Sequence, residues 1–239
     1  MAAYDHLNKY YYSRPNFQDG TALFHALVAQ FVPPGKRVLE IGAGPSNGTT
    51  AFLASRSTVV GLDVSPEIRE NRYLEEARVF DGVTFPFADR SFDACCSNYV
   101  LEHVPNPQDH FAEVFRILKP GGVYCFRTPN RWHYVALASS LLPHPAHVKL
   151  ANRLRDLDAH AHDPYPTAYR ANTRGRLQTL CRQAGLCAIH FVMVEKEPSY
   201  ARRYQLLFWP MMFYEKLVNS TEFMAPFRAN IFGCLQKPL

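Results

Sequence analysis

The spacing of apolar residues switches repeatedly between strand-like and helix-like periods from residue 35 to about residue 195. Short apolar runs bounded by turn residues predict strands, and apolar residues at helical spacing predict helices. The predicted strands cover 37–41, 58–62, a short run ending at Asp81, 92–97, 123–128 and 187–194; the predicted helices cover 49–55, a short one opening at Ser65-Pro66, 108–118 and 173–184. Strands that alternate with helices form a mostly parallel sheet. We therefore expect an α/β protein with a Rossmann-like, doubly wound sheet and helices on both faces.

Segments outside this alternation define the expected domain organisation. Residues 1–34 form an N-terminal aromatic and helical cap, with a helical run at 21–32, and residues 35–130 form the first half of the sheet domain. Residues 131–171 lose the alternation and are interpreted as a lid insertion, because long irregular segments in such domains are often functional. Residues 172–239 complete the sheet and end in an apolar tail.

An aromatic run in that tail, Leu206–Tyr214, contains Pro210, which is expected to break it. Three roles stay open for this run: covering an active site, forming the face of a homodimer, or resting on a membrane surface. The membrane role ranks last because no charge asymmetry accompanies the run.

Composition and charge narrow the class of protein. The chain has 239 residues, of which 47% are hydrophobic and 20% charged, as in globular proteins. It has no apolar stretch of about eighteen residues, so stable membrane insertion is not expected. The six cysteines form no C-x-x-C pair and are interpreted as reduced, buried thiols of a cytoplasmic protein. The net charge of +5 is scattered, so no nucleic-acid partner is expected.

The first predicted strand runs into a glycine-rich turn, Glu40-Ile41-Gly42-Ala43-Gly44, that precedes a helix. This is the arrangement of a nucleotide-binding crevice, since glycine lets the backbone approach a ligand. A dinucleotide fingerprint requires glycine or alanine where Asn47 stands, and Pro45 removes a backbone donor that a pyrophosphate would use. Both departures disfavour NAD or FAD. They favour a ligand that has no phosphate groups.

The second predicted strand leads into Asp63. A carboxylate at this place accepts hydrogen bonds from both hydroxyls of a ribose. The alternative is an aspartate that caps the next helix, a role that Ser65 is already suited to fill.

Five motifs in order carry a resemblance to a known family. They are Val38–Gly44, Gly61–Ser65, Phe85–Asp93, Val100–Val104 and Leu118–Gly122. Together they resemble the class I methyltransferases that use S-adenosylmethionine, in particular the small-molecule group similar to ubiquinone-biosynthesis enzymes. The resemblance covers roughly residues 35–195. It implies in-line transfer of a methyl group to a small organic acceptor, aromatic compounds and natural products included, with S-adenosylhomocysteine as the product.

The resemblance also implies the roles of individual residues. Gly42, Ala43 and Gly44 would line the methionine part of the cofactor, with Glu40 near its ammonium group or bracing the loop. Asp63 would hold the ribose, and Val64 would pack on the adenine. The remaining cofactor-binding candidates are Asp81 at the adenine amino group, Gly82 beside it, and Ser97 and Asn98 facing the methionine moiety. Ser46, where the family often has glycine, and the short link from Asp63 to Asp81 depart from the pattern.

Methyl transfer needs a base only when the acceptor must lose a proton. The candidates for a catalytic base are His103, which follows the fourth strand, and His133, which follows the fifth; the alternative for His103 is orienting a loop. His160 and His162 are interpreted as part of an exposed polar lid, so no metal is expected. Two other functions stay open: a non-catalytic cofactor-binding regulatory module and, less favoured, an NAD-dependent oxidoreductase.

Overall fold

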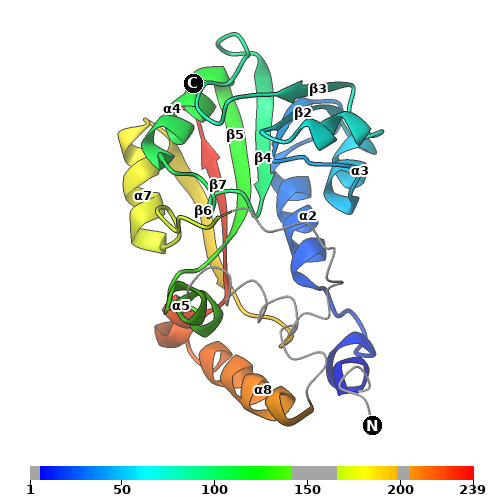
Figure 1. Ribbon diagram of the computed structural model, residues 1–239, viewed down its shortest axis with the longest axis vertical. Coiled ribbons are helices and arrows are strands. Elements are labelled where there is room, and N and C mark those ends of the chain that lie inside the picture. Colours follow the sequence, from blue (N-terminus) through cyan, green and yellow to red (C-terminus); the bar gives the residue numbers. More distant parts are fainter. Residues whose placement is uncertain (1–5, 142–165, 199–204) are drawn as a thin grey trace. The chain divides into compact units, whose positions relative to one another are not determined.

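The computed structural model describes residues 6–141, 166–198 and 205–239 (Figure 1). The chain divides into two compact units. The α/β unit comprises Thr21–Pro129, Thr167–Val192 and Ile231–Leu239, and the helical unit comprises Met1–Gly20, Asn130–Pro166 and Met193–Asn230. The four-part division expected from the sequence stays a prediction.

One seven-stranded sheet has the strand order β3-β2-β1-β4-β5-β7-β6. The strands are β1 (Arg37–Ile41), β2 (Thr58–Asp63), β3 (Glu76–Val79), β4 (Phe92–Asn98), β5 (Leu118–Pro129), β6 (Cys187–Val194) and β7 (Asn230–Gln236). The pairs β1–β2, β1–β4, β2–β3 and β4–β5 are parallel. At the start of β5, Gly121 N–H donates to the carbonyl of Lys237, just beyond the end of β7. This pairing makes β7 antiparallel, so the sheet is mixed, and the predicted fold class is confirmed.

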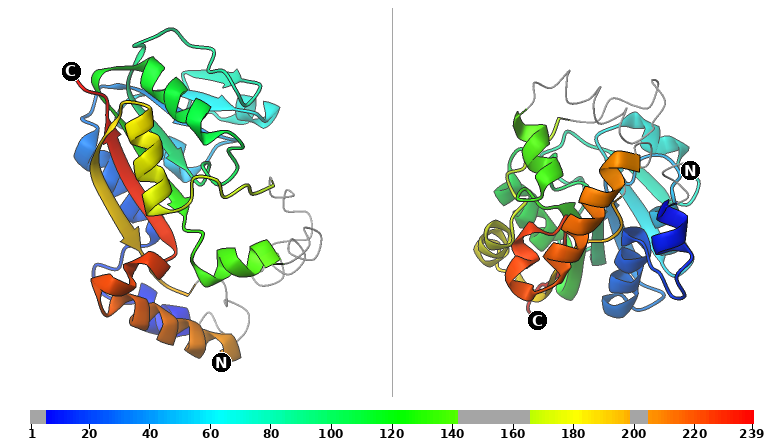
Figure 2. Two further views of the ribbon diagram at one scale, coloured as in Figure 1. Left: turned by 90° about the vertical axis from the view of Figure 1, so that its left-hand side faces the viewer. Right: turned by 90° about the horizontal axis from the view of Figure 1, so that it is seen from below.

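Helices cover both faces of this sheet. They are α2 (Gly20–Phe31), α3 (Gly48–Ala54), α4 (Pro107–Ile117), α7 (Arg174–Gln183) and the short 3-10 helix η2 (Pro66–Glu70). Figures 1 and 2 show α4 and α7 on one face and α2 and α3 on the other. The caps lie where the sequence places them: the Ser65 hydroxyl accepts from Glu67 N–H, and the Thr173 hydroxyl accepts from Arg176 N–H.

Two predicted strand boundaries are wrong. Strand β3 ends at Val79 rather than at Asp81. Strand β5 begins at Leu118 rather than at residue 123, so residues 119–122 lie inside the strand. Its pairing with β4 shifts register between Phe92 and Ala94. A strand start that is already irregular tolerates the missing N–H of Pro120.

The helical unit contains a π-helix η1 (Asn8–Tyr12), α5 (Tyr134–Leu141), α8 (Gln205–Asn219) and η4 (Glu222–Phe227). The prediction that Pro210 breaks the aromatic run is wrong, because α8 continues through it. A proline five residues after the start removes only one hydrogen bond, the one to the carbonyl of Leu206. Inside this unit Leu7, Tyr11 and Phe208 form an aromatic and aliphatic core.

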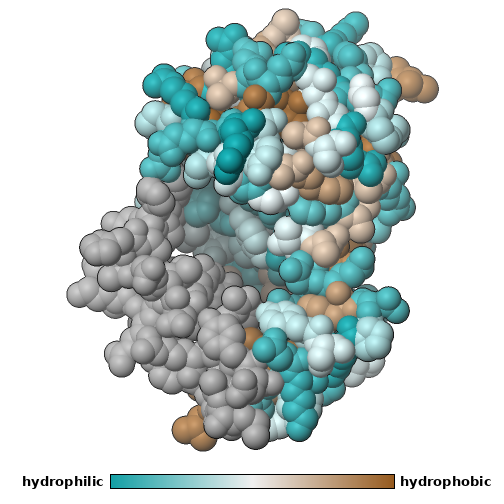
Figure 3. All heavy atoms as spheres, turned by 90° about the vertical axis from the view of Figure 1, so that its right-hand side faces the viewer, coloured by the Kyte–Doolittle hydropathy of each residue, from teal (hydrophilic) through white to brown (hydrophobic). Residues whose placement is uncertain are grey.

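The surface carries single exposed apolar side chains among polar ones. Figure 3 shows hydrophobic side chains exposed between hydrophilic ones on one face of the molecule. Val64 and Val83, which are 45% and 54% exposed, are two such residues of the α/β unit. Cys187 is also exposed, so the expectation that every cysteine is buried is wrong for that residue. Within the described ranges, every helix is too short or too polar to cross a membrane.

Candidate functional site

The glycine turn follows directly from the end of β1. Gly42 has φ +72°, and its N–H donates to the carbonyl of Leu62 on β2 at 2.7 Å. A Cβ atom at this position would overlap the side chain of Val100. Gly44, also at positive φ, donates its N–H to the Asp63 carboxylate at 2.9 Å. Only glycine fits at residue 42, both by backbone conformation and by space.

Helix α3 begins immediately after this turn with its first amides already bonded. The Asn47 side-chain oxygen accepts from Thr49 N–H at 2.8 Å and from Thr50 N–H at 3.0 Å, which makes Asn47 the N-cap. Its amide nitrogen donates back to the carbonyl of Ala43 at 2.7 Å. Free amides at a helix N-terminus are what a phosphate group binds. Here the cap occupies them, which agrees with the expectation of a ligand without phosphates at this position.

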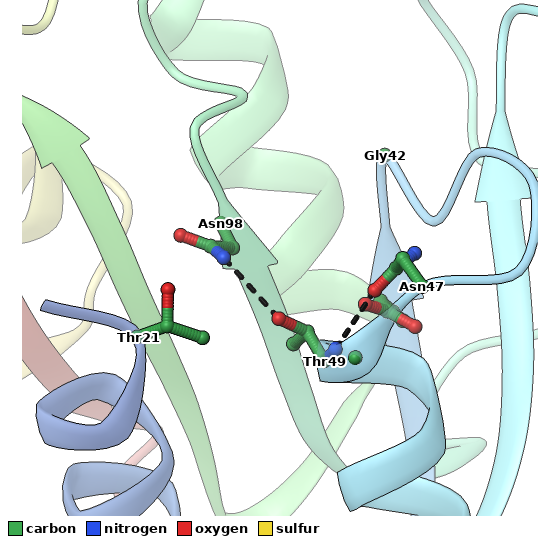
Figure 4. A pocket seen from close by; sticks show the side chains of 7 residues that line it. Thr21, Gly42, Asn47, Thr49 and Asn98 are labelled. Carbon is green, nitrogen blue, oxygen red and sulfur yellow. Dashed lines mark hydrogen bonds between the residues drawn. The ribbon is translucent and has the colours of Figure 1, made fainter. Parts of the chain in front are cut away.

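A pocket of about 320 Å³ opens beside the turn (Figure 4). This volume lies at the lower end of the range of small-molecule sites. Its lining comes from β1, the glycine turn, the start of α3, the end of β4 and the start of α2: Thr21, Glu40, Gly42, Asn47, Gly48, Thr49 and Asn98. The site therefore lies outside the carboxyl ends of β1 and β4, where ligands bind in sheets of this kind.

Glu40 is the only ionisable residue among the lining residues named, and it is 4% exposed. Burial raises the pKa of this carboxyl to about 7, against the lowering effect of a hydrogen bond from the Thr50 side chain. Its Oε2 atom is buried and has no hydrogen-bond partner. A buried acceptor without a donor is costly, so a ligand that brings a donor would be favoured here.

Asn98 presents a second acceptor of the same kind. Its Nδ2 donates to the Thr49 hydroxyl at 3.3 Å, as drawn in Figure 4. Its Oδ1 is buried without a partner. Two residues that line the pocket, one on β1 and one on β4, thus each have a buried acceptor without a protein donor, and a donor group on a ligand would satisfy it.

Asp63 lies 9% exposed at the end of β2. One carboxylate oxygen accepts from Gly44 N–H and the other from Ser65 N–H at 2.8 Å. Ser65 caps η2, and Asp63 bonds the backbone of the turn before it, so the ribose role of Asp63 stays a prediction beside its role in the turn. An ionised carboxylate has about four acceptor positions, so two stay open to a ligand.

The residues expected around an adenine lie next to Asp63. The Asp81 carboxylate is exposed, and its Oδ1 accepts from Val83 N–H at 2.8 Å and from Thr84 N–H at 3.0 Å. These bonds lower the pKa of Asp81. A Cβ on Gly82, which has φ +83°, would lie 3.5 Å from the Val64 side chain. Because Phe80 N–H donates to the carbonyl of Asp63, the ends of β2 and β3 are joined.

Of the candidates predicted from the sequence, only Glu40, Gly42 and Asn98 line the pocket; the candidates at the ends of β2 and β3, and those that follow, are not among the lining residues. The Ser97 hydroxyl is buried and lies 2.7 Å from the Tyr124 hydroxyl. His103 is in the α/β unit, with Nε2 3.9 Å from Glu102 Oε1. His133 is in the helical unit, 4% exposed, and burial lowers its pKa to about 4. His160 and His162 lie outside the described residues.

Four lining residues were not among the sequence candidates: Thr21, Asn47, Gly48 and Thr49. A capping pattern at Asn47-Gly48-Thr49 was available, because an asparagine before an apolar run marks a helix start. Thr21 carried no such signal, because it comes from a helix that precedes the sheet.

Comparisons with known proteins agree with this geometry. The family described as "Methyltransferase domain" matches residues 39–126. A demethylmenaquinone methyltransferase from Tropheryma whipplei (strain Twist) is 35% identical over 114 residues, which cover 42% of this chain and 46% of the relative. An uncharacterized methyltransferase from Mycobacterium sp. (strain KMS) is 38% identical over 97 residues, 38% of each chain. The matches thus span less than half the length of these curated relatives.

The likeness of the fold extends further than the sequence match. The crystal structure of an S-adenosylmethionine-dependent methyltransferase from Methanosarcina mazei superposes with a TM-score of 0.56 at 18% identity, covering 89% of this chain and 97% of that one. The fold is that of the class I methyltransferases. Residues 39–126 are thus similar to a methyltransferase domain, and the fold is similar to that of a solved methyltransferase that depends on S-adenosylmethionine.

Proposed function

We propose that the protein is an S-adenosylmethionine-dependent methyltransferase that acts on a small organic acceptor. The observation that carries this proposal is the pair of buried acceptors, Glu40 Oε2 and Asn98 Oδ1, that line one pocket without a donor. An ammonium group has three N–H donors and a positive charge. The α-ammonium of the cofactor's methionine part fits that demand.

The adenosine half of the cofactor is assigned to the neighbouring strand ends. The two open acceptor positions of Asp63 suit the two ribose hydroxyls. Val64 and Gly82 supply an apolar wall for the adenine, and the Oδ2 of Asp81 is assigned to its amino group. Because the Asn47 cap occupies the first amides of α3, a dinucleotide finds no pyrophosphate site at this turn.

When bound, S-adenosylmethionine supplies a methyl group already activated on a sulfonium. The protein's main task is then to hold donor and acceptor in line, and orientation alone contributes up to about 7–11 kcal/mol in well-aligned systems. In this assignment Asp63 and Glu40 hold the two ends of the cofactor. Gly42 lets the backbone approach it closely.

His103 and His133 remain proposals as general bases. A base works best when its pKa is near the working pH. The pKa of about 4 leaves His133 neutral but weakly basic at neutral pH. His103 belongs to the α/β unit that holds the pocket and is the stronger candidate.

The proposal that the acceptor is a small molecule is supported by one of the relatives. The Tropheryma whipplei relative is, by its name, a methyltransferase of demethylmenaquinone, a small molecule. Its match covers less than half of either chain, so it supports the class of acceptor and leaves the compound open.

Calorimetric titration with S-adenosylhomocysteine tests the proposal, with NAD as the matched control. We expect saturable binding of S-adenosylhomocysteine and none of NAD. Binding of NAD, with no binding of S-adenosylhomocysteine at millimolar concentration, would contradict it. Methyl transfer to a panel of small acceptors, followed by mass spectrometry, separates an enzyme from a non-catalytic module that only binds the cofactor.

A further inference from the structure

His25 of helix α2 contacts helix α3 at a residue that lines the pocket. Its Nε2 atom lies 3.4 Å from the hydroxyl oxygen of Thr49. Its ring stacks on the ring of Phe52, about one turn further along α3, with the ring centres 4.2 Å apart and the planes 2° apart. The stack fixes the plane of the imidazole and holds its Nε2 edge against Thr49. The contact with Thr49 links His25 to the pocket.

The Thr49 hydroxyl in turn connects His25 to Asn98. Asn98 Nδ2 donates to this hydroxyl at 3.3 Å, as drawn in Figure 4. A threonine hydroxyl has one hydrogen to donate and two lone pairs that accept. It can therefore donate to only one of these two neighbours, the imidazole or the amide. The two ends of an amide have nearly the same shape, so its hydrogen-bond partners decide which end points where.

The hydrogen on the imidazole decides what the amide of Asn98 offers to a ligand. If Nε2 carries no hydrogen, it accepts from Thr49, Thr49 accepts from Asn98 Nδ2, and Asn98 Oδ1 is left for a ligand donor. If Nε2 carries a hydrogen, it donates to Thr49, and the hydroxyl is then able to donate to the amide oxygen. The amide would turn and leave its NH₂ group for the ligand instead. The structure has the first orientation, with Oδ1 buried and without a partner.

We propose that His25 is a positioning residue of the cofactor site. Its Nε2 accepts from the Thr49 hydroxyl, and this keeps Asn98 Oδ1 available to the ammonium group of S-adenosylmethionine. The stack on Phe52 explains an aromatic ring at residue 25 but does not require a nitrogen at its edge. This inference rests on the proposed function, which supplies the ammonium. His25 acts through Thr49 and does not itself bind the cofactor.

A matched pair of variants separates the nitrogen from the ring. His25→Phe keeps an aromatic ring on Phe52 and removes the acceptor, whereas His25→Gln keeps a side-chain acceptor and removes the ring. We expect His25→Phe to weaken S-adenosylhomocysteine binding about 3- to 10-fold, the worth of one hydrogen bond between uncharged groups. His25→Gln should weaken it less than about twofold. The control is His190→Phe, which changes a histidine in ring contact with Phe31 and should bind as wild type does.

Methylthioadenosine, which lacks the amino-acid part, is titrated into the same variants. It has no ammonium, so its affinity should be unchanged in His25→Phe. If His25→Phe weakens both ligands alike, His25 only supports the packing of the pocket, and the inference is wrong. It is also wrong if His25→Phe binds S-adenosylhomocysteine as wild type does, or if His25→Gln loses as much affinity as His25→Phe.

The position of the ring hydrogen is observed directly in the wild-type protein. Long-range proton–nitrogen correlation spectra show which ring nitrogen carries the hydrogen. They are recorded on labelled protein saturated with S-adenosylhomocysteine, at mildly alkaline pH where an imidazole is neutral. We expect the His25 hydrogen on Nδ1 and none on Nε2, and the loss of the signal in a His25 variant identifies it. A hydrogen on Nε2 would overturn the inference.

Two failures are kept apart from this outcome. The melting temperature identifies a variant that does not fold, and the spectrum of the wild-type protein then decides. Failure of the wild-type protein to bind S-adenosylhomocysteine is a separate result. It would reject the proposed function and this inference with it.

Discussion

Two buried glutamates, one in each unit, have the same ionisation behaviour and different surroundings. Burial raises the pKa of Glu40 to about 7 and that of Glu195 to about 8. Glu195 Oε2 accepts from Ala229 N–H at 2.7 Å and lies 3.4 Å from His133 Nε2. Glu40 Oε2 has no partner and belongs to a residue that lines the pocket.

The difference shows that a raised pKa alone does not identify a ligand site. Glu195 is packed against protein groups, with His133 in ring contact with Tyr134 and Tyr214. Its carboxyl joins β6 to the segment before β7 and has a structural explanation. The Glu40 carboxyl has a hydrogen bond from the Thr50 side chain, but its Oε2 has no protein donor. Glu40 and Glu195 therefore differ in their hydrogen-bond partners and not in the direction of their pKa shifts.

The largest expected effect concerns cofactor affinity. Glu40→Gln should weaken S-adenosylhomocysteine binding by about 10- to 150-fold, because hydrogen bonds to charged groups contribute about 1.5–3 kcal/mol. Glu195→Gln, the matched control, should change it less than about twofold. Methylthioadenosine has no ammonium, so its affinity should be unchanged in both variants. Equal losses in the two variants, measured by calorimetry, would remove the distinction between the glutamates.

The second prediction concerns the pH dependence of stability. A carboxyl whose folded pKa is raised costs stability as the pH rises from its unfolded pKa to its folded one. For Glu40 this window runs from 4.5 to about 7, and for Glu195 from 4.5 to about 8. Each Gln variant should therefore gain stability over wild type across its window, on the order of 3–5 kcal/mol at about 1.4 kcal/mol per pKa unit.

Denaturant titrations at several pH values measure this gain. Saturating S-adenosylhomocysteine should reduce the gain of Glu40→Gln, because the bound ammonium stabilises the ionised carboxylate of the wild-type protein. It should leave the gain of Glu195→Gln unchanged. A gain that is independent of pH for both variants would refute the assignment of raised pKa values.

The smallest expected effect concerns the ribose. Asp63→Ala should weaken both S-adenosylhomocysteine and methylthioadenosine by about 10-fold or more, which corresponds to about 1.4 kcal/mol. Asp63→Ala should lower the affinity for both ligands, whereas Glu40→Gln should lower only the affinity for S-adenosylhomocysteine. Asp63→Asn keeps an acceptor for one of the two backbone amides and should lose less. Unchanged affinity for methylthioadenosine in Asp63→Ala would rule out the ribose assignment.

Periodicity and capping chemistry were sufficient to predict most of the α/β unit. Strand β6 and the caps at Ser65 and Thr173 coincide with their predictions, because each depends on local residues. The start of β5 did not, because Pro120 and two glycines are typical of a turn. Only pairing with β4 and with Lys237, far along the chain, draws these residues into the sheet.

The site residues that stand at the ends of β1 and β4 were predictable from the sequence, and those from other elements were not. Glu40, Gly42 and Asn98 stand at strand ends that the motifs mark, and all three line the pocket. Ser97, one residue before Asn98, points its hydroxyl to Tyr124, since successive residues of a strand face opposite sides. Thr21 depends on how a preceding helix approaches the pocket, which no local pattern encodes.

A crystal structure of the protein with S-adenosylhomocysteine tests the cofactor assignment most directly. We expect the α-ammonium nitrogen to lie within hydrogen-bonding distance, about 2.7–3.2 Å, of both Glu40 Oε2 and Asn98 Oδ1, with the ribose hydroxyls at Asp63. A complex in which the ammonium points away and both acceptors remain without a donor would contradict it.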